Sequence, residues 1–124
     1  MTLYNEAVEA YFSRPVGEYA GDHEGQAGSI AAGTWIGLRA GVQEGCLTNV
    51  DFRAFACPQI IAVCHWLRDD LEGRQVKACQ RFDRENVRQM FDIPFEKAGK
   101  LLILQDALAR LLASIQAQAG LDKR

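Results

Sequence analysis

A single cysteine at the junction of a predicted strand and a predicted helix is the residue of this 124-residue chain best placed to do chemistry. Residues 52–61 read as a strand that ends at Cys57 and turns into a helix at Pro58. Proline suits the first helical position because it has no N–H group to leave unpaired there. Free backbone N–H groups and the helix dipole would favour a thiolate at Cys57. Such a sulfur atom could bind a metal or accept a second sulfur atom.

The other three cysteines, Cys46, Cys64 and Cys79, form no C-x-x-C pair with Cys57 or with one another. The familiar zinc and redox spacings are therefore absent. Cys64 follows Cys57 by two helical turns, about 10 Å, which is too far for both to bind one ion. We expect Cys64 to be a buried core thiol, and His65 to be a solvent-facing or hydrogen-bonded helix residue.

Composition limits the class of protein. The chain is 48% hydrophobic and 24% charged, with a net charge of −2, which suits a single domain over residues 1–124. It has no basic excess that would indicate nucleic-acid binding, and no apolar run of the roughly 18 residues that a membrane span needs. Glu6 and Glu9 interrupt the apolar N-terminal residues, unlike a signal peptide. The expected location is cytoplasmic and reducing.

Apolar periodicity predicts the elements that precede Cys57. Residues 3–12 fit a short amphipathic helix, and residues 21–28 read as a glycine-containing loop, with a weak strand signal at 27–31. From Thr34 onward, two alternating runs joined by a turn at 43–45 predict an antiparallel hairpin. In the first run one face should carry Ile36, Leu38, Ala40 and Val42, and the other Gly37, Arg39 and Gly41. In the second run one face should carry Val50, Phe52 and Ala54, and the other Asn49, Asp51 and Arg53.

Beyond the second strand the period becomes helical. A first helix should end at Gly73, Asp83 suits the N-cap of a second helix over 84–91, and Pro94 breaks the chain again. A long final helix should end before Gly120. The two apolar stripes are Ile60, Val63, Cys64, Leu67 and Leu71, then Leu101, Leu104, Leu108, Leu111 and Ile115. The segregated elements predict an α+β fold: an N-terminal helix, a small, about three-stranded antiparallel sheet, and a helical C-terminal half packed on that sheet.

This order of elements resembles the iron–sulfur cluster scaffold family, the NifU N-terminal or IscU-like domain, over about residues 4–112. The first loop of that family contains a glycine, a variable pair, a cysteine, a glycine and an aspartate. Gly28 and Gly33 match its glycines, whereas Ala32 and Thr34 take the places of the cysteine and the aspartate.

The second family motif is an aromatic-rich strand that ends in a cysteine. Phe52, Phe55 and Cys57 match this motif. Cys57 therefore keeps one of the three cysteines that hold the cluster in the family.

The third family region is a chaperone-recognition segment of the Leu-Pro-Pro-Val-Lys type, followed by histidine and cysteine. Ile93, Pro94 and Lys97 match this segment and are candidate chaperone-binding residues. Gly99 and Lys100 take the places of the histidine and the cysteine.

The resemblance implies a non-enzymatic role in iron–sulfur cluster assembly, with a cysteine desulfurase and an Hsp70-type chaperone as partners. Because one family cysteine remains, we expect cluster binding through Cys57 to be impaired or to depend on a partner. Lys100, if it lies near Cys57, would favour the thiolate.

Two alternatives stay open. The chain could be a non-catalytic binding or regulatory module that engages the desulfurase or chaperone without holding a cluster. In that case Cys57 would be retained as a small residue in a tight strand-to-helix turn. An unrelated thiol-dependent function of Cys57 alone is the third hypothesis.

Overall fold

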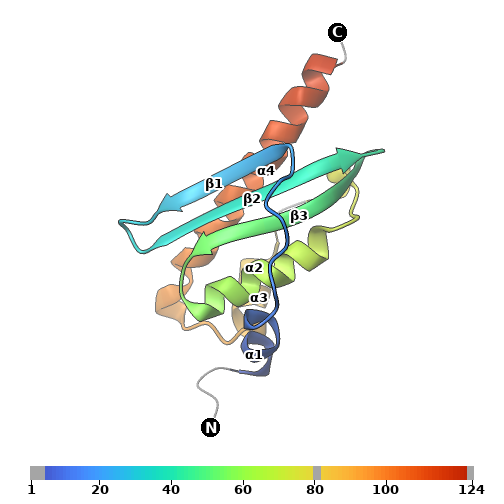
Figure 1. The fold of residues 1–124 in the computed structure, drawn as a ribbon. Helices are drawn as coiled ribbons and strands as arrows, with labels where there is room; N and C mark the ends of the chain where they lie inside the picture. Colours follow the sequence, from blue (N-terminus) through green and yellow to red (C-terminus); the bar gives the residue numbers. More distant parts are fainter. Residues whose placement is uncertain (1–4, 80–81, 123–124) are drawn as a thin grey trace.

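The computed structural model describes residues 5–79 and 82–122. In chain order the elements are α1 (Glu6–Phe12), β1 (His23–Ser29), β2 (Thr34–Gln43), β3 (Cys46–Phe55), α2 (Pro58–Leu71), η1 (Val76–Ala78), α3 (Arg84–Met90), η2 (Phe95–Lys97) and α4 (Gly99–Asp122). The strands form one antiparallel sheet in the order β1-β2-β3, and α2 and α4 pack on one of its faces (Figure 1). The predicted α+β fold is confirmed. Within these residues, no helix has the length and apolar character needed to cross a membrane.

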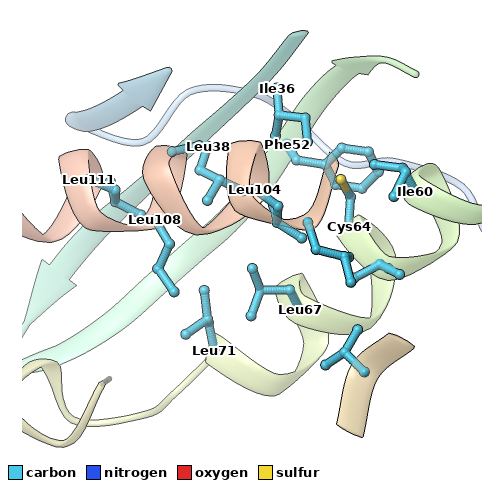
Figure 2. Packing of buried hydrophobic residues seen from close by; sticks show 14 of the residues in the cluster. Ile36, Leu38, Phe52, Ile60, Cys64, Leu67, Leu71, Leu104, Leu108 and Leu111 are labelled. Carbon is cyan, nitrogen blue, oxygen red and sulfur yellow. The ribbon is translucent and has the colours of Figure 1, made fainter. Parts of the chain in front are cut away.

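The hydrophobic core lies between α2, α4 and the inner face of the sheet. Both predicted helical stripes are confirmed, because every predicted residue is at most 6% exposed. Figure 2 shows Ile60, Cys64, Leu67 and Leu71 of α2 and Leu104, Leu108 and Leu111 of α4 beside Ile36, Leu38 and Phe52 of the sheet. Removing this apolar surface from water, at about 25 cal/mol per Å², is the main favourable term in folding.

The predicted loop over residues 21–28 is wrong, because most of this segment forms β1. β1 pairs with β2 along its whole length. The weak strand signal at 27–31 overlaps β1 only as far as Ser29, and the following residues lie in the turn to β2. Glycines that resemble turn signals in the sequence therefore lie inside a strand.

Gly25 shows why β1 needs a glycine. A Cβ atom on Gly25 would lie 2.2 Å from the carbonyl oxygen of Ala107 and 2.3 Å from the amide nitrogen of Leu111, both in α4. A strand glycine of this kind marks the close approach of another backbone. The neighbouring residue of β1, Gln26, accepts at its carbonyl a 2.7 Å hydrogen bond from Arg110 of α4. The backbones of β1 and α4 are therefore packed directly against each other.

The predicted hairpin of β2 and β3 is confirmed. Glu44 and Gly45 have φ angles of 53° and 79°, the left-handed conformation that suits a two-residue turn between twisted strands. Val42 departs from the predicted inward set, since it is 40% exposed. It lies beside this turn, at the end of the sheet.

Residues 13–22, which link α1 to β1 and which we call the strap, cross the outer face of the sheet (Figure 1). Arg53 of β3 donates a 2.8 Å hydrogen bond to the carbonyl of Gly17 in the strap. Asp51 lies on the face opposite the core, as predicted, yet it is only 2% exposed because the strap covers it.

The first and last helices of the chain, α1 and α4, each differ from the sequence prediction at one end. α1 begins at Glu6, with the side chain of Asn5 as its cap, and the predicted start at Leu3 lies outside the described residues. α4 continues to Asp122, so its predicted end before Gly120 is wrong. A glycine costs a helix about 1 kcal/mol and does not by itself end it.

α2 begins at Pro58 and Asp83 caps α3, as predicted, whereas α2 ends at Leu71, two residues before the predicted end at Gly73. The prediction for His65 is wrong, since this residue is 2% exposed and its Nδ1 has no hydrogen-bond partner among the described residues. Its ring meets that of Phe52 edge-on, 4.8 Å between centroids. Burial lowers the pKa of His65, which favours a neutral imidazole inside the core.

Gly25→Ala should destabilise the protein by about 2–3 kcal/mol, because the added methyl group would push β1 away from α4. Chemical denaturation followed by circular dichroism measures this loss. Gly99→Ala is the matched control, since a Cβ atom there meets nothing within 4 Å, and its stability should not fall. An equal effect of the two substitutions would contradict the close packing of β1 on α4.

Candidate functional site

Cys57 lies where β3 ends and α2 begins, as the sequence predicts. It is the N-cap of α2, with φ −71° and ψ 162°, and Pro58 is the first helical residue. The carbonyl of Cys57 accepts the first helical hydrogen bond, from Ile61, at 3.0 Å. Its side chain is half-buried and makes no capping hydrogen bond. The thiol therefore belongs to the residue at the positive end of a helix, and its sulfur accepts no capping hydrogen bond from the helix backbone.

The turn between β1 and β2 holds Ala32, and β2 begins with Thr34, the first two positions that the sequence analysis matches to family ligands. Ala32 is exposed in this turn, and its N–H donates a 3.1 Å hydrogen bond to Oγ of Ser29. Thr34 is the first residue of β2 and is 4% exposed. Neither side chain offers a thiolate or a carboxylate.

The start of α4 holds the other two positions that the sequence analysis matches to family ligands. Gly99 and Lys100 are its first two residues, one exposed and the other half-buried. The first turns of α4 lie against the β1–β2 hairpin, because a Cβ atom on Gly28 would come within 3.0 Å of Ile103. The hairpin turn, the start of α2 and the start of α4 lie at the same end of the molecule (Figure 1). The fold thus brings Ala32 and Cys57 to one end with the start of α4.

The lysine that contacts the first turn of α2 is Lys97. Its Nζ donates to Oε1 of Gln59 at 3.4 Å, and Gln59 is 8% exposed. The sequence prediction places a cationic partner of Cys57 at Lys100 and does not include Gln59. The position of Gln59, two residues after the cysteine, is the only sequence signal that could have found it. Lys97 thus brings a positive charge to the same end of α2 as the thiol.

The predicted chaperone-binding segment is only partly on the surface. Ile93 is 1% exposed and belongs to the core, and its N–H donates to the carbonyl of Arg88 at 2.9 Å. Pro94 is half-buried, whereas Phe95 is 79% exposed. The surface part of this segment therefore begins at Pro94 and extends to Lys97.

Four large apolar side chains are exposed at the Cys57 end, and we call them the apolar rim. They are Ile30 (63% exposed), Phe55 (51%), Phe95 (79%) and Leu102 (43%). They come from the β1–β2 turn, the end of β3, η2 and the first turn of α4, respectively. Large apolar groups exposed at one end of a molecule favour a protein interaction site there.

The sulfur chemistry of this end depends on Cys57 alone. Cys46 and Cys79 lie beside Gln75, at the opposite end of β3 from Cys57, where Sγ of Cys79 donates to the Gln75 carbonyl. Burial raises the pKa of Cys79, and raises that of Cys64 far more strongly. Within residues 5–79 and 82–122, no three His, Cys, Asp or Glu side chains come together in a way that could hold a metal ion.

The chain is similar to known proteins at two levels. The model of the NifU-like N-terminal domain matches residues 3–120. A crystal structure described as an iron–sulfur cluster assembly scaffold protein for the SUF system, from the thermophile Fervidobacterium islandicum AW-1, aligns with a TM-score of 0.66. That alignment covers 88% of this chain and 96% of the other at 13% identity, so it supports the fold alone. No curated protein matches the chain significantly.

Iodoacetamide should alkylate Cys57 in the folded protein and leave Cys64 unmodified, with rates that differ on the order of a hundredfold or more. The reason is that Cys64 is fully buried, whereas Cys57 is half-exposed. Peptide mapping by mass spectrometry measures both sites, and the two rates should converge in denaturant. Comparable protection of Cys57 and Cys64 in the native state would contradict an accessible thiol.

Proposed function

Because the chain belongs to the family of NifU-like N-terminal domains, we propose that it acts in iron–sulfur cluster assembly with Cys57 as its one sulfur ligand. Cys57 would accept sulfur, and it would hold iron or a cluster only together with a partner protein. The observation that carries this proposal is the half-buried thiol at the start of a 14-residue helix, beside the turn that Lys97 contacts.

The need for a partner follows from the number of ligands. A [2Fe–2S] cluster takes four thiolates or equivalent ligands. At the altered family positions, Ala32 and Gly99 have no donor side chain, and Thr34 and Lys100 offer a hydroxyl and an ammonium. Cys57 alone therefore supplies one ligand of four, and the remaining ligands would come from another protein or from small thiols.

Sulfur transfer to Cys57 requires no cofactor on this chain. The Cys57 thiolate would attack the outer sulfur of a persulfide on a cysteine desulfurase. A new S–S bond forms at Cys57, the S–S bond of the donor breaks, and the donor cysteine leaves as a thiolate. The chain would thus act as an acceptor, and the enzyme in this step would be the desulfurase.

A binding module without cluster chemistry is the second candidate, and the apolar rim favours it. The rim is exposed whereas the chain supplies one cluster ligand of four, so docking would not depend on cluster binding. A desulfurase would dock on the apolar rim, and an Hsp70-type chaperone would bind the surface segment 94–97, in which Phe95 and Glu96 are exposed. In that case Lys100 would contact the docked protein and would not act on the Cys57 thiol.

Anaerobic incubation with a cysteine desulfurase and L-cysteine should add one sulfur atom to the wild-type chain and none to Cys57→Ser. Intact-protein mass spectrometry under non-reducing conditions measures the added sulfur. Cys46→Ser is the matched control, because Cys46 is also half-buried but lies at the opposite end of β3, and it should load normally.

Two results would contradict this proposal. Sulfur loading that survives in Cys57→Ser would remove Cys57 as the acceptor. A stoichiometric cluster on the chain alone, reconstituted with iron and sulfide, would show that no partner is needed. Normal desulfurase binding with no loading in the wild type would favour the binding module.

Phe55→Ser and Phe95→Ser should each weaken desulfurase binding about tenfold or more, because buried aromatic anchors dominate protein interfaces. Cys57→Ser should leave the affinity nearly unchanged. Isothermal titration calorimetry measures the three affinities. Phe12→Ser is the control, since Phe12 is 45% exposed on α1, outside the apolar rim. Equal losses in all the phenylalanine variants would argue against a docking surface at the rim.

A further inference from the structure

His65 is a buried base on α2, the helix that packs against both β3 and α1. It is 2% exposed, its ring meets that of Phe52 edge-on, and its Nδ1 has no hydrogen-bond partner among the described residues. A protonated imidazole carries a charge and donates at both ring nitrogens. Protonation would therefore place a charge and an unpaired donor in the core, which is costly unless the ring reaches water.

The residues that hold the start of the strap lie one helical turn from His65. Arg68 and Asp69 follow His65 by three and four positions, so the three side chains share one face of α2. Nη1 of Arg68 donates to the carbonyl of Pro15 at 3.1 Å, and Arg14 forms an ion pair with Asp69. The strap is therefore fixed to the helix face that His65 occupies.

The charges that face His65 cancel one another. They belong to Arg68 and Asp69 of α2, Asp51 of β3 and Arg14 of the strap. Each of the two carboxylates is already paired with an arginine. The side chains of α1 add no buried counter-charge, since Glu6 and Glu9 are exposed and a tyrosine such as Tyr11 is uncharged near neutral pH. With no net charge to stabilise an imidazolium, burial keeps His65 neutral.

Little apolar surface holds residues 5–22, which we call the α1–strap segment, to the rest of the molecule. Val8 is the only buried residue of α1, and of the ten strap residues only Tyr19 and Gly21 are not exposed. Segments with few buried apolar contacts open at a lower cost in free energy than the core does. The α1–strap segment is therefore the part of the molecule beside His65 that can open while the core stays folded.

We propose that protonation of His65 in mildly acidic solution releases the α1–strap segment from α2 and β3, so that the fold contains a pH-dependent switch. Burial holds the pKa of His65 below its ordinary value in the closed state, whereas a hydrated ring has the ordinary value of about 6.5. The released state therefore binds the proton more tightly, and release should increase as the pH falls below about 6.5. This inference does not rest on the proposed sulfur chemistry of Cys57.

The test is hydrogen exchange of the full chain, followed by mass spectrometry and normalised to the intrinsic exchange rate at each pH. The amides of α1 report release, because a seven-residue helix is not stable alone in water. Between about pH 7.5 and 5.5 their protection should fall about fivefold to tenfold, the effect of one proton, while the protection of α4 stays constant. Carboxylates remain ionised in this range, so the histidines are the side chains expected to titrate.

His65→Phe keeps a ring in the core but cannot bind a proton, so the protection of α1 should no longer depend on pH in this variant. His23→Gln is the matched control. His23 is the other histidine of the chain, is 8% exposed, and lies on β1 within 3.3 Å of Ser114 in α4. Its replacement should leave the pH dependence of α1 as in the wild type.

Three results would overturn the proposal: constant protection of α1 in the wild type, equal losses in α1 and α4, or a pH dependence that survives in His65→Phe. If His65→Phe fails to fold by circular dichroism, an NMR titration of the two histidine rings in the wild type decides, with His23→Gln to assign them. A His65 pKa clearly below about 6.5 would support the switch. A value of about 6.5 or higher would overturn it, because the closed state would then bind the proton as tightly as the released state.

Discussion

The direct contact between the backbones of β1 and α4 is the constraint on which the rest of the molecule depends. Gly25 has no Cβ atom, and a methyl group there would meet the backbone of Ala107 and Leu111. The approach brings the apolar stripe of α4 onto the sheet and holds its first turns against the β1–β2 hairpin. This packing fixes the position of the β1–β2 turn relative to the start of α4. Both lie at the end of the molecule where Cys57 caps α2.

A second constraint acts on the outer face of the sheet, where hydrogen bonds replace apolar packing. Three arginines, from β2, β3 and α2, donate to strap carbonyls: Arg39 to Gly21, Arg53 to Gly17 and Arg68 to Pro15. Because each guanidinium carries several donors in a fixed plane, it can bond a carbonyl and still neutralise a nearby carboxylate. Asp51 is tolerated under the strap because two of these arginines lie within 4 Å of it.

The stability of this fold and the chemistry of its end depend on different residues. The core residues that α2 and α4 contribute lie away from the exposed turn that holds Ala32 and from the first residue of α4, Gly99. Replacement of a ligand by a small residue at these exposed positions leaves no buried group unpaired and opens no cavity. The packing that holds the fold together is therefore separate from the exposed positions at the Cys57 end.

The sequence by itself determined the elements whose signals are local. The stripes of α2 and α4, the turn at Glu44 and Gly45, and the capping position of Cys57 follow from periodicity, turn chemistry and the proline that starts α2. Family membership also rests on the sequence, through the order of these elements and the match over residues 3–120.

Only the tertiary structure decided the features that depend on a distant segment. The glycines of β1 look like loop residues until α4 is packed against them, and Asp51 looks exposed until the strap crosses the sheet. Lys97 reaches Gln59 across 38 positions of sequence, so no local pattern could pair them. In each case the environment of a residue is set by a neighbour that is remote in the chain. The sequence around the residue therefore cannot identify that neighbour.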